Sequence, residues 1–412
     1  MISASAVRVA HPTKVLTGRV SLPASKSEAN RALIIRALSG QDFAIHNLSD
    51  ANDTALLNRL LSTPAGPEVS AEDAGTVMRF LTAYYAITNQ AVTLTGTDRM
   101  CHRPIGVLVD ALRTLGAKID YAGQEGFPPL QLQGFESSGT NQLTVRADVS
   151  SQYISALLMV APLLPQGLEL TLAGKIGSEP YIRMTLAQMA HFGVQAVFEG
   201  NKISVPAQNY QAKEYTVESD WSAASYWYSM VALAQEADIF LPALRPDSLQ
   251  GDSVLPDLMT PFGVQTTFTE EGVRLTKAPA HQDIHRIDFS ACPDLAQTVA
   301  ALAAGLQLEV EMTGLESLRI KETDRILAIQ TELPKLGATL QETAPGVFKV
   351  IPGNQAKNEA RIHTYEDHRM AMAFAPLALK QEIVIDEPNV VKKSYPRFWE
   401  VLEQAGFQIS PV

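Results

Sequence analysis

Two hydrophobic patterns alternate along the chain. In the first, apolar residues at helical spacing run into a glycine and then into an alternating, strand-like stretch. Its copies are ALRTLGAKI, AQMAHFGVQAV, PDLMTPFGVQT, ELPKLGATL and VLEQAGFQI, with Gly116, Gly193, Gly263, Gly337 and Gly406. A glycine just past a helix is typical of a left-handed C-cap. The copies recur about every 70 residues, which predicts an internal repeat. We interpret LLNRLLSTPAGPEV as a sixth, degenerate copy.

The second pattern is a polar start that leads into an apolar, alanine-rich helix and then a short strand. Its six copies are SKSEANRALIIRAL, DAGTVMRFLTAYYA, DVSSQYISALLMVA, ESDWSAASYWYSMVALA, CPDLAQTVAALAAG and EDHRMAMAFAPLAL. Strands such as AVTLTG, LELTLAG and QEIVIDEP follow. Because these helices are apolar nearly all round, we expect them to be buried. The glycine-terminated helices are amphipathic, so we expect them to cover the outside.

Six units, each with two helices and several strands, account for the whole chain. A chain of 412 residues is also too long for one ordinary core, which favours two domains. We place the hinge at 216–220 and predict an α/β protein of two domains with three repeats each. The first domain comprises residues 19–218, and the second comprises residues 1–18 together with residues 219–412. A short N-terminal strand around 7–15 would then belong to the second domain.

Composition narrows the function classes. Hydrophobic content of 46% and charged content of 19% are typical of a soluble globular protein. The excess of 44 acidic over 33 basic residues argues against a nucleic-acid or membrane partner, but not against a small anionic ligand. Two cysteines, Cys101 and Cys292, support neither a disulfide framework nor a thiolate metal site. We expect no signal peptide and no transmembrane span, and therefore a cytoplasmic protein.

Several polar helix starts hold more than a cap needs, which makes them candidates for anion binding. Helix N-termini attract phosphate and carboxylate groups. The candidates at these starts are Lys26, Ser27, Arg31, Ser150, Ser151, Gln152, Asp294 and the cluster at 366–369. Capping alone is the competing interpretation for any single start. In SLRIKETDRILAI, Lys321 and Arg325 share a helix face beside Glu322, although a solvated face would look much the same.

Other chemistries lack a motif. The chain has no phosphate-binding Gly-x-x-x-x-Gly-Lys-Ser/Thr loop, no Gly-x-Gly-x-x-Gly after a strand and no His-Glu-x-x-His. His281 and His285 are four residues apart, but their surroundings read as loop and strand, so we expect no metal there.

Nine segments occur in the order found in 5-enolpyruvylshikimate-3-phosphate synthases, and the chain resembles that family from about residue 19 to residue 398. The segments are LPASKSEANRA, DAGTVMR, RPIGVLVDALRTLGA, SSQYISALLM, SEPYIRMTL, PDLAQT, LRIKETDR, EDHRMAMA and KKSYPRF. The resemblance implies a two-domain inside-out α/β barrel of six βαβαββ repeats with buried parallel helices. It also implies an active site in the cleft between the domains.

The resemblance implies transfer of the enolpyruvyl group of phosphoenolpyruvate to the 5-hydroxyl of shikimate 3-phosphate. The reaction passes through a tetrahedral intermediate, releases phosphate and needs no metal or cofactor. We expect a monomer. The family is the target of glyphosate, which competes with phosphoenolpyruvate, and its effect depends on packing around Gly75.

Site residues carry over by motif position. Asp294 resembles the proton acceptor, Glu322 resembles the proton donor, and Lys26 is the third catalytic candidate. The implied ligands of shikimate 3-phosphate are Lys26, Ser27, Arg31, Ser150, Ser151, Gln152, Ser178, Tyr181, Asp294, Ser317 and Lys321. The implied ligands of phosphoenolpyruvate are Lys26, Asp73, Gly75, Arg103, Gln152, Arg325, His368, Arg369 and Lys393. Fixed cations suit two anionic substrates, and arginine can bind both oxygens of a carboxylate.

Departures and alternatives remain. Asp73 stands where the family usually has Asn, so it is either near phosphoenolpyruvate or a plain helix cap. Ser317 stands where some members have Asn, and residues 62–72 are abbreviated. The sister enolpyruvyl transferase acting on UDP-N-acetylglucosamine has a reactive cysteine before an Arg-Pro motif, but Cys101 lies only two residues before Arg103. The third alternative is a non-catalytic anion-binding relative, which would lose Asp294, Glu322 or some cations.

Overall fold

The structure, a computed structural model, describes residues 4–147, 150–174, 176–280, 286–353 and 360–412, so the His281 and His285 pair lies outside it. The chain divides into two compact units. Unit 1 comprises Met1–Ser25, Asp50–Asn52 and Glu218–Val412, and unit 2 comprises Lys26–Ser49 and Asp53–Val217. Of the helices in these ranges, none is long and apolar enough to cross a bilayer.

Unit 2 holds two four-stranded sheets and one two-stranded sheet among its described residues. In each larger sheet a parallel strand pair is followed by two antiparallel pairs. In sheet order, their strands are β4 (Glu68–Ser70), β5 (Val92–Thr95), β7 (Leu130–Phe135) and β6 (Ala117–Tyr121), then β8 (Gln142–Arg146), β9 (Leu168–Ala173), β11 (Lys202–Val205) and β10 (Val197–Glu199). The small parallel sheet contains β3 (Ile45–His46) and β12 (Tyr215–Thr216).

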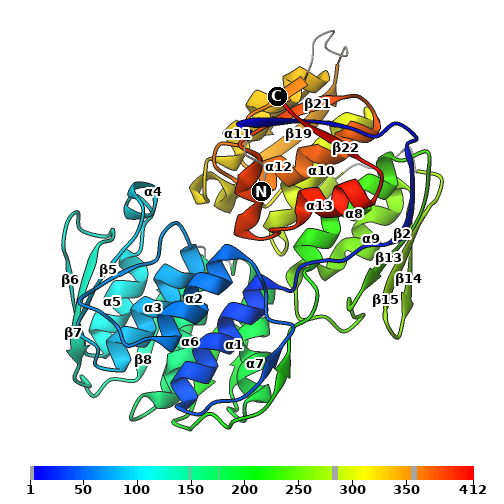
Figure 1. Ribbon diagram of the computed structural model, residues 1–412. Helices are drawn as coiled ribbons and strands as arrows, with labels where there is room; N and C mark the ends of the chain where they lie inside the picture. The colour runs from blue at the N-terminus through cyan, green and yellow to red at the C-terminus, as the bar shows by residue number, and fades with distance from the viewer. Residues whose placement is uncertain (1–3, 148–149, 175, 281–285, 354–359) are drawn as a thin grey trace. The chain divides into compact units, whose positions relative to one another are not determined.

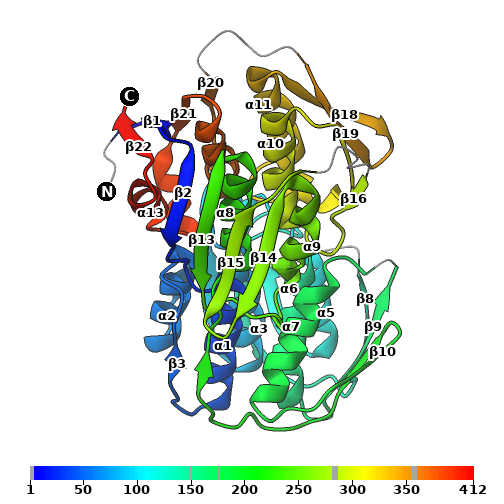
Figure 2. The same cartoon turned by 90° about the vertical axis from the view of Figure 1, so that its right-hand side faces the viewer.

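Unit 1 repeats this arrangement in three four-stranded sheets. Each again begins with a parallel pair and continues antiparallel. In sheet order, the strands are β2 (Val15–Arg19), β13 (Glu236–Pro242), β15 (Gly272–Lys277) and β14 (Val264–Thr269), then β16 (Arg286–Asp288), β17 (Val310–Thr313), β19 (Val347–Pro352) and β18 (Ala338–Ala344), and finally β20 (Ala360–Ile362), β21 (Ile383–Asp386), β1 (Ala6–Ala10) and β22 (Gln408–Pro411). Figure 2 shows the first of these sheets in front of α8.

The six alanine-rich segments all form helices, as predicted. They are α1 (Lys26–Ser39), α3 (Gly75–Ile87), α6 (Ser151–Val160), α8 (Trp221–Leu233), α10 (Ala296–Leu306) and α12 (His368–Phe374). Every residue of α8 except Ser222 is buried, and α3, α6 and α10 are nearly as enclosed. Within unit 2, α1, α3 and α6 pack on one another (Figure 1). Helices without a polar face can be accommodated only inside such a core.

The glycine-terminated helices are confirmed as well. They are α5 (Gly106–Leu115), α7 (Glu179–His191), α9 (Leu255–Met259), α11 (Arg325–Glu332) and α13 (Phe398–Gln404), with α9 and α11 each prolonged by a 3₁₀ turn. All five glycines have positive φ, from 75° at Gly337 to 116° at Gly116. At Gly116 a Cβ atom would lie 1.9 Å from the carbonyl oxygen of Glu136. A side chain there is excluded by both backbone conformation and space.

The sixth copy is degenerate in structure too. Its helix α2 (Asn52–Ser62) leads directly into β4, the first strand of the next repeat. Gly66 has no positive φ, and the copy has only the two-stranded sheet of β3 and β12. The first repeat therefore lacks the hairpin that completes the other five. Elsewhere in unit 2, the short helix α4 (Asp98–Cys101) follows β5.

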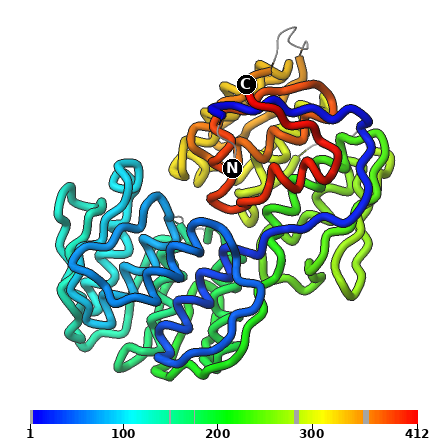
Figure 3. The backbone as a smooth tube through the Cα atoms, viewed as in Figure 1, coloured from blue at the N-terminus to red at the C-terminus, as the bar shows by residue number. Residues whose placement is uncertain are grey.

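The N-terminal segment forms two strands of unit 1 rather than one. β2 pairs in parallel with β13, and β1 lies between β21 and β22, antiparallel to both (Figure 3). Lys14, with φ of 57°, lies in the turn that separates the two strands. The last repeat thus obtains its third strand from the opposite end of the chain.

Candidate active site

In unit 1, one arginine holds three carboxylates. Arg325, the first residue of α11, is 1% exposed. Its Nη1 lies 2.9 Å from Asp294 Oδ1, its Nη2 lies 3.0 Å from Glu322 Oε2, and its Nε lies 2.7 Å from Asp367 Oδ2. Bonds between ionised partners in a buried setting are among the strongest in proteins. We call the set Asp294, Lys321, Glu322, Arg325, Asp367, Arg369 and Lys393 the Asp294 cluster.

Three helix starts bring the cluster together. Asp294 lies in the 3₁₀ helix Pro293–Leu295 that leads into α10. Asp324 caps α11 by accepting from the Leu327 amide, which fixes the helix beginning at Arg325. Asp367 caps α12 by accepting from the Arg369 amide at 2.8 Å. Asp367 therefore both caps the start of α12 and holds Arg325, because one carboxylate can accept from both donors.

The remaining cations surround the two predicted proton-transfer residues. Arg369 Nη2 lies 3.0 Å from Asp294 Oδ2, and Lys321 Nζ lies 4.0 Å from Asp294 Oδ1. Lys393, 7% exposed, lies 3.9 Å from Glu322 Oε1.

The cations set the protonation state of Asp294. Burial alone would raise the pKa of Asp294, but Arg369, Lys321 and Arg325 offset it and hold that pKa well below its usual range. Asp294 is therefore ionised at neutral pH. Burial also lowers the pKa of Lys321, although Asp294 counteracts part of that shift.

In unit 2, Lys26 and Arg31 both lie on α1 but differ in exposure. The Lys26 side chain is 17% exposed, and its Nζ lies 3.1 Å from Asp53 Oδ2. Arg31 is 1% exposed and donates to the Ser27 carbonyl at 2.8 Å, Ser155 Oγ at 2.9 Å and Thr185 Oγ1 at 2.7 Å. Burial lowers the pKa of Arg31 to about 10, so its guanidinium stays charged at neutral pH.

Two further arginines gather at the start of α3. A Cβ atom on Gly75 would lie 3.1 Å from Arg103 Nη2 and 3.2 Å from Arg79 Nη1. Arg79 donates to the carbonyls of Gly75 at 3.3 Å and Pro104 at 3.2 Å. Arg103 is 8% exposed, and within the described residues its guanidinium has no hydrogen-bond or ion-pair partner. A buried guanidinium without a protein acceptor is suited to binding an anion.

The hydroxyl candidates of unit 2 lie at two other helix starts. Ser150 caps α6 by accepting from the Gln152 amide at 3.3 Å, and Ser151 is the first residue of that helix. Ser178 precedes α7 in the left-handed region, with φ of 52°, an uncommon conformation for a residue other than glycine. Tyr181 is the third residue of α7, and the Arg31 guanidinium carbon lies 5.9 Å from the centre of its ring.

Three other candidates from the sequence, Asp73, Ser317 and His368, lie outside the clusters described above. Asp73 is exposed and directly precedes Ala74, the N-cap residue of α3. Ser317 is half-buried in the 3₁₀ helix Glu316–Ile320. His368 is 1% exposed, with Nδ1 3.5 Å from Asp367 Oδ1.

Sequence reasoning missed three residues that the geometry includes, namely Asp53, Arg79 and Asp252. Asp367 was a candidate only as part of the cluster at 366–369, and its contact with Arg325 was not predicted. The spacing of Gly75 and Arg79, four residues apart on one helix, was a usable signal for Arg79. Asp252 had none, because it becomes part of the site only through its contact with Ser222.

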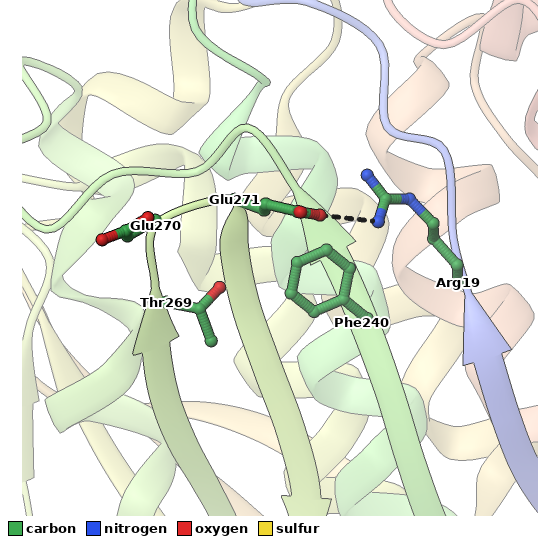
Figure 4. Close-up of a pocket in the computed structure, with 5 residues that line it drawn as sticks. All are labelled: Arg19, Phe240, Thr269, Glu270 and Glu271. Atoms are coloured by element: carbon green, nitrogen blue, oxygen red, sulfur yellow. Dashed lines mark hydrogen bonds and ion pairs between the residues drawn. The ribbon is translucent and has the colours of Figure 1, made fainter.

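A surface pocket of unit 1 is a poor alternative site. Arg19, Phe240, Thr269, Glu270 and Glu271 line it (Figure 4). The Arg19 guanidinium lies over the Phe240 ring and pairs with Glu271 at 3.2 Å, so the one cation of this pocket is already neutralised. Among the described residues, no group of three His, Cys, Asp or Glu side chains is placed to hold a metal ion.

Comparisons with known proteins agree with one another. A family model described as EPSP synthase (3-phosphoshikimate 1-carboxyvinyltransferase) matches residues 57–402. A 3-phosphoshikimate 1-carboxyvinyltransferase from Bacteroides fragilis is 49% identical over 394 residues, which cover 95% of each chain. The enzyme of that name from Neisseria meningitidis serogroup B is 36% identical, covering 93% of this chain and 94% of the relative. EPSP synthase from Acinetobacter baumannii has a similar fold, with a TM-score of 0.77, 21% identity and coverage of 98% of this chain and 99% of that one.

Proposed function

The chain belongs to the EPSP synthase family, and we propose that it transfers the enolpyruvyl group of phosphoenolpyruvate to the 5-hydroxyl of shikimate 3-phosphate. The products are 5-enolpyruvylshikimate 3-phosphate and inorganic phosphate. The hydroxyl oxygen adds to the central carbon of phosphoenolpyruvate while the methylene carbon gains a proton, which gives a tetrahedral intermediate. Loss of a methyl proton and departure of phosphate then restore the double bond. The reaction therefore needs a base, an acid and several cations.

One observation carries the proposal: Arg325 holds Asp294 and Glu322 with the same guanidinium, at 2.9 and 3.0 Å. Two carboxylates in reach of one substrate provide the acid and base. Asp294 has the lowered pKa of an ionised group and accepts the proton of the 5-hydroxyl. Glu322 exchanges a proton with the methylene carbon. Lys321, whose Nζ lies 4.0 Å from Asp294 Oδ1, binds shikimate 3-phosphate, while Arg325, Arg369 and Lys393 bind phosphoenolpyruvate, with His368 beside them.

Unit 2 supplies the remaining charge. Lys26, Ser27 and Arg31 bind shikimate 3-phosphate, and Lys26 also contacts phosphoenolpyruvate. Ser150, Ser151 and Ser178 bind the phosphate of shikimate 3-phosphate, Tyr181 lies against its ring, and Gln152 contacts both substrates. Arg103 beside Gly75 binds phosphoenolpyruvate, with Asp73 as a further candidate, and Ser317 of unit 1 is a further candidate ligand of shikimate 3-phosphate. The unpartnered Arg103 guanidinium supports this division, because an incoming anion would be its first acceptor.

A phosphate-release assay tests the proposal. We expect inorganic phosphate only when shikimate 3-phosphate and phosphoenolpyruvate are both present. Omitting either substrate is the control for simple phosphatase activity. Release with UDP-N-acetylglucosamine in place of shikimate 3-phosphate would contradict the assignment, and no release with either acceptor would indicate a non-catalytic relative.

We further propose that the chain acts as a monomer in the cytoplasm, without a metal or another cofactor. Every residue assigned above comes from one chain, and Cys101 and Cys292 are free thiols. Light scattering during size-exclusion chromatography should give the mass of one chain, about 45 kDa. Activity should survive dialysis against a chelator if the reaction needs no metal ion.

A further inference from the structure

Asp252 is a buried carboxyl beside the Asp294 cluster, and no step of the proposed reaction uses it. It lies in the 3₁₀ helix Gly251–Val254 and is 2% exposed. Its Oδ2 accepts a hydrogen bond from the Ser222 hydroxyl. Its Oδ1 is buried and has no hydrogen-bond partner within the described residues. A buried carboxylate with one neutral donor is costly to keep ionised.

A single hydroxyl connects Asp252 to the site. Ser222 Oγ donates to Asp252 and accepts from Arg369 Nη2 at 3.3 Å. The same Arg369 nitrogen lies 3.0 Å from Asp294 Oδ2. Ser222 is the one residue of α8 that is not buried, and its hydroxyl contacts both Asp252 and Arg369. Asp252, Asp294 and a bound anion therefore compete for the charge of one arginine.

The titratable and charged groups around Asp252 come from the starts of three helices. Asp220 caps α8, Cys292 and Asp294 precede α10, and Arg369 belongs to α12. Burial raises the pKa of Asp252 to about 7, the negative charge of Asp294 adds to the shift, and Arg369 and the Ser222 hydroxyl offset part of it. Burial also raises the pKa of the Cys292 thiol well above its usual value, so this group stays neutral.

We propose that Asp252 is a positioning residue for Arg369, and that it takes up a proton from solvent when an anionic ligand binds this arginine. The neutral carboxyl leaves the Arg369 guanidinium to Asp294 and the ligand, whereas the ionised carboxylate draws it away. A bound anion adds negative charge near Asp252 and so favours its neutral form. This inference rests on the proposed function, because it takes phosphoenolpyruvate to be the anion at Arg369.

Calorimetry in two buffers of different ionisation enthalpy measures the proton uptake directly. With phosphoenolpyruvate as the ligand near pH 7, and without shikimate 3-phosphate so that no turnover occurs, the wild-type protein should take up part of a proton that Asp252→Asn does not. The difference between the two proteins cancels the ionisation of the ligand itself. Glu332→Gln is the matched control, because Glu332 is a fully buried carboxylate of unit 1 that contacts Lys335 and Tyr365 instead. Equal proton uptake in wild type and Asp252→Asn would overturn the proposal.

The pH profile provides a second readout that a structural role would not move. Between about pH 6 and 8, KM for phosphoenolpyruvate should rise about tenfold more in the wild type than in Asp252→Asn, with kcat affected less. Should Asp252→Asn fail to fold, Ser222→Ala keeps the carboxyl but removes the donor that lowers its pKa. The midpoint of the profile should then move to higher pH, and an unmoved midpoint would count against the proposal.

The outcome is separable from that of the proposed function. If the wild type releases phosphate normally but Asp252→Asn keeps the wild-type pH profile, only the inference about Asp252 fails. If no phosphate is released, the proposed function fails, and calorimetry with inorganic phosphate still reports whether anion binding at Arg369 is coupled to a proton.

Discussion

The buried arginines of the two units are stabilised in opposite ways. In unit 1, Arg325 and Arg369 contact carboxylates, and Arg325 alone holds three. In unit 2, Arg31 donates to neutral oxygens, and Arg103 has no partner among the described residues. The charges of Arg325 and Arg369 are thus largely neutralised by carboxylates, whereas Arg31 and Arg103 make no ion pair among the described residues.

This difference separates two tasks. Uncompensated guanidinium groups attract anions but have to be held in place by neutral contacts, and their burial costs free energy. Compensated groups fix carboxylates in defined protonation states, which suits proton transfer. We therefore expect substitutions in unit 1 to damage both folding and chemistry, and substitutions in unit 2 to damage mainly substrate binding.

The largest effect should follow from Arg325→Ala. Removing the guanidinium leaves Asp294, Glu322 and Asp367 buried without their shared cation, so the free energy of unfolding should fall by about 3–5 kcal/mol. The value of kcat should fall at least about 10³-fold, because both proton-transfer groups lose their position. Chemical denaturation and phosphate release measure the two effects. A stable variant with lost activity would show that the cluster is not structural.

An effect on binding alone should follow from Arg103→Met. The apolar replacement removes a guanidinium that has no hydrogen-bond or ion-pair partner among the described residues, so stability should stay the same or rise slightly. KM for phosphoenolpyruvate should rise about 100-fold, equivalent to about 3 kcal/mol. Arg79→Met is the matched control, because its guanidinium is also buried but donates to two carbonyls, and its loss should cost about 1–3 kcal/mol of stability. Equal destabilisation by the two variants would show that Arg103, like Arg79, stabilises the fold, and would contradict a role confined to binding.

The smallest effect concerns acid stability. Because the pKa of Asp294 is lower in the folded than in the unfolded chain, Asp294 stabilises the fold above its unfolded pKa of about 4. That contribution is lost as the pH falls toward the folded pKa. Between about pH 5 and 2.5, wild type should lose about 2 kcal/mol more stability than Asp294→Asn. Parallel loss in both proteins, measured by denaturation at each pH, would contradict the charge balance described for unit 1.

The repeat and its helices could be predicted because each copy carries the same signal. A positive-φ glycine at Gly116 or Gly337 and an apolar helix such as α10 depend on local sequence, so six copies reinforce one another. The position of β1 between β21 and β22 could not be predicted, because the sequence of a five-residue strand does not indicate which distant strands it pairs with. Strand pairing across most of the chain is a tertiary property.

The candidate residues of the site were identified by motif, but their interactions were not. Lys321, Glu322 and Arg325 looked like a solvated helix face, and only the fold brings Asp294 and Asp367 to Arg325. Asp252 carried no pattern at all. Its importance follows from burial and from a hydroxyl on another helix, neither of which is encoded near it in the sequence.

The strand β1 has a consequence for biosynthesis. It is among the first segments to leave the ribosome, whereas its neighbours β21 and β22 begin at Ile383 and Gln408. At about 5–20 residues per second, β1 waits roughly 20–80 s for them, with both edges available to other chains. All of unit 2 is translated in that interval, so its core can form first. A permuted gene that encodes β1 after β22 would end this delay and should reduce aggregation during expression.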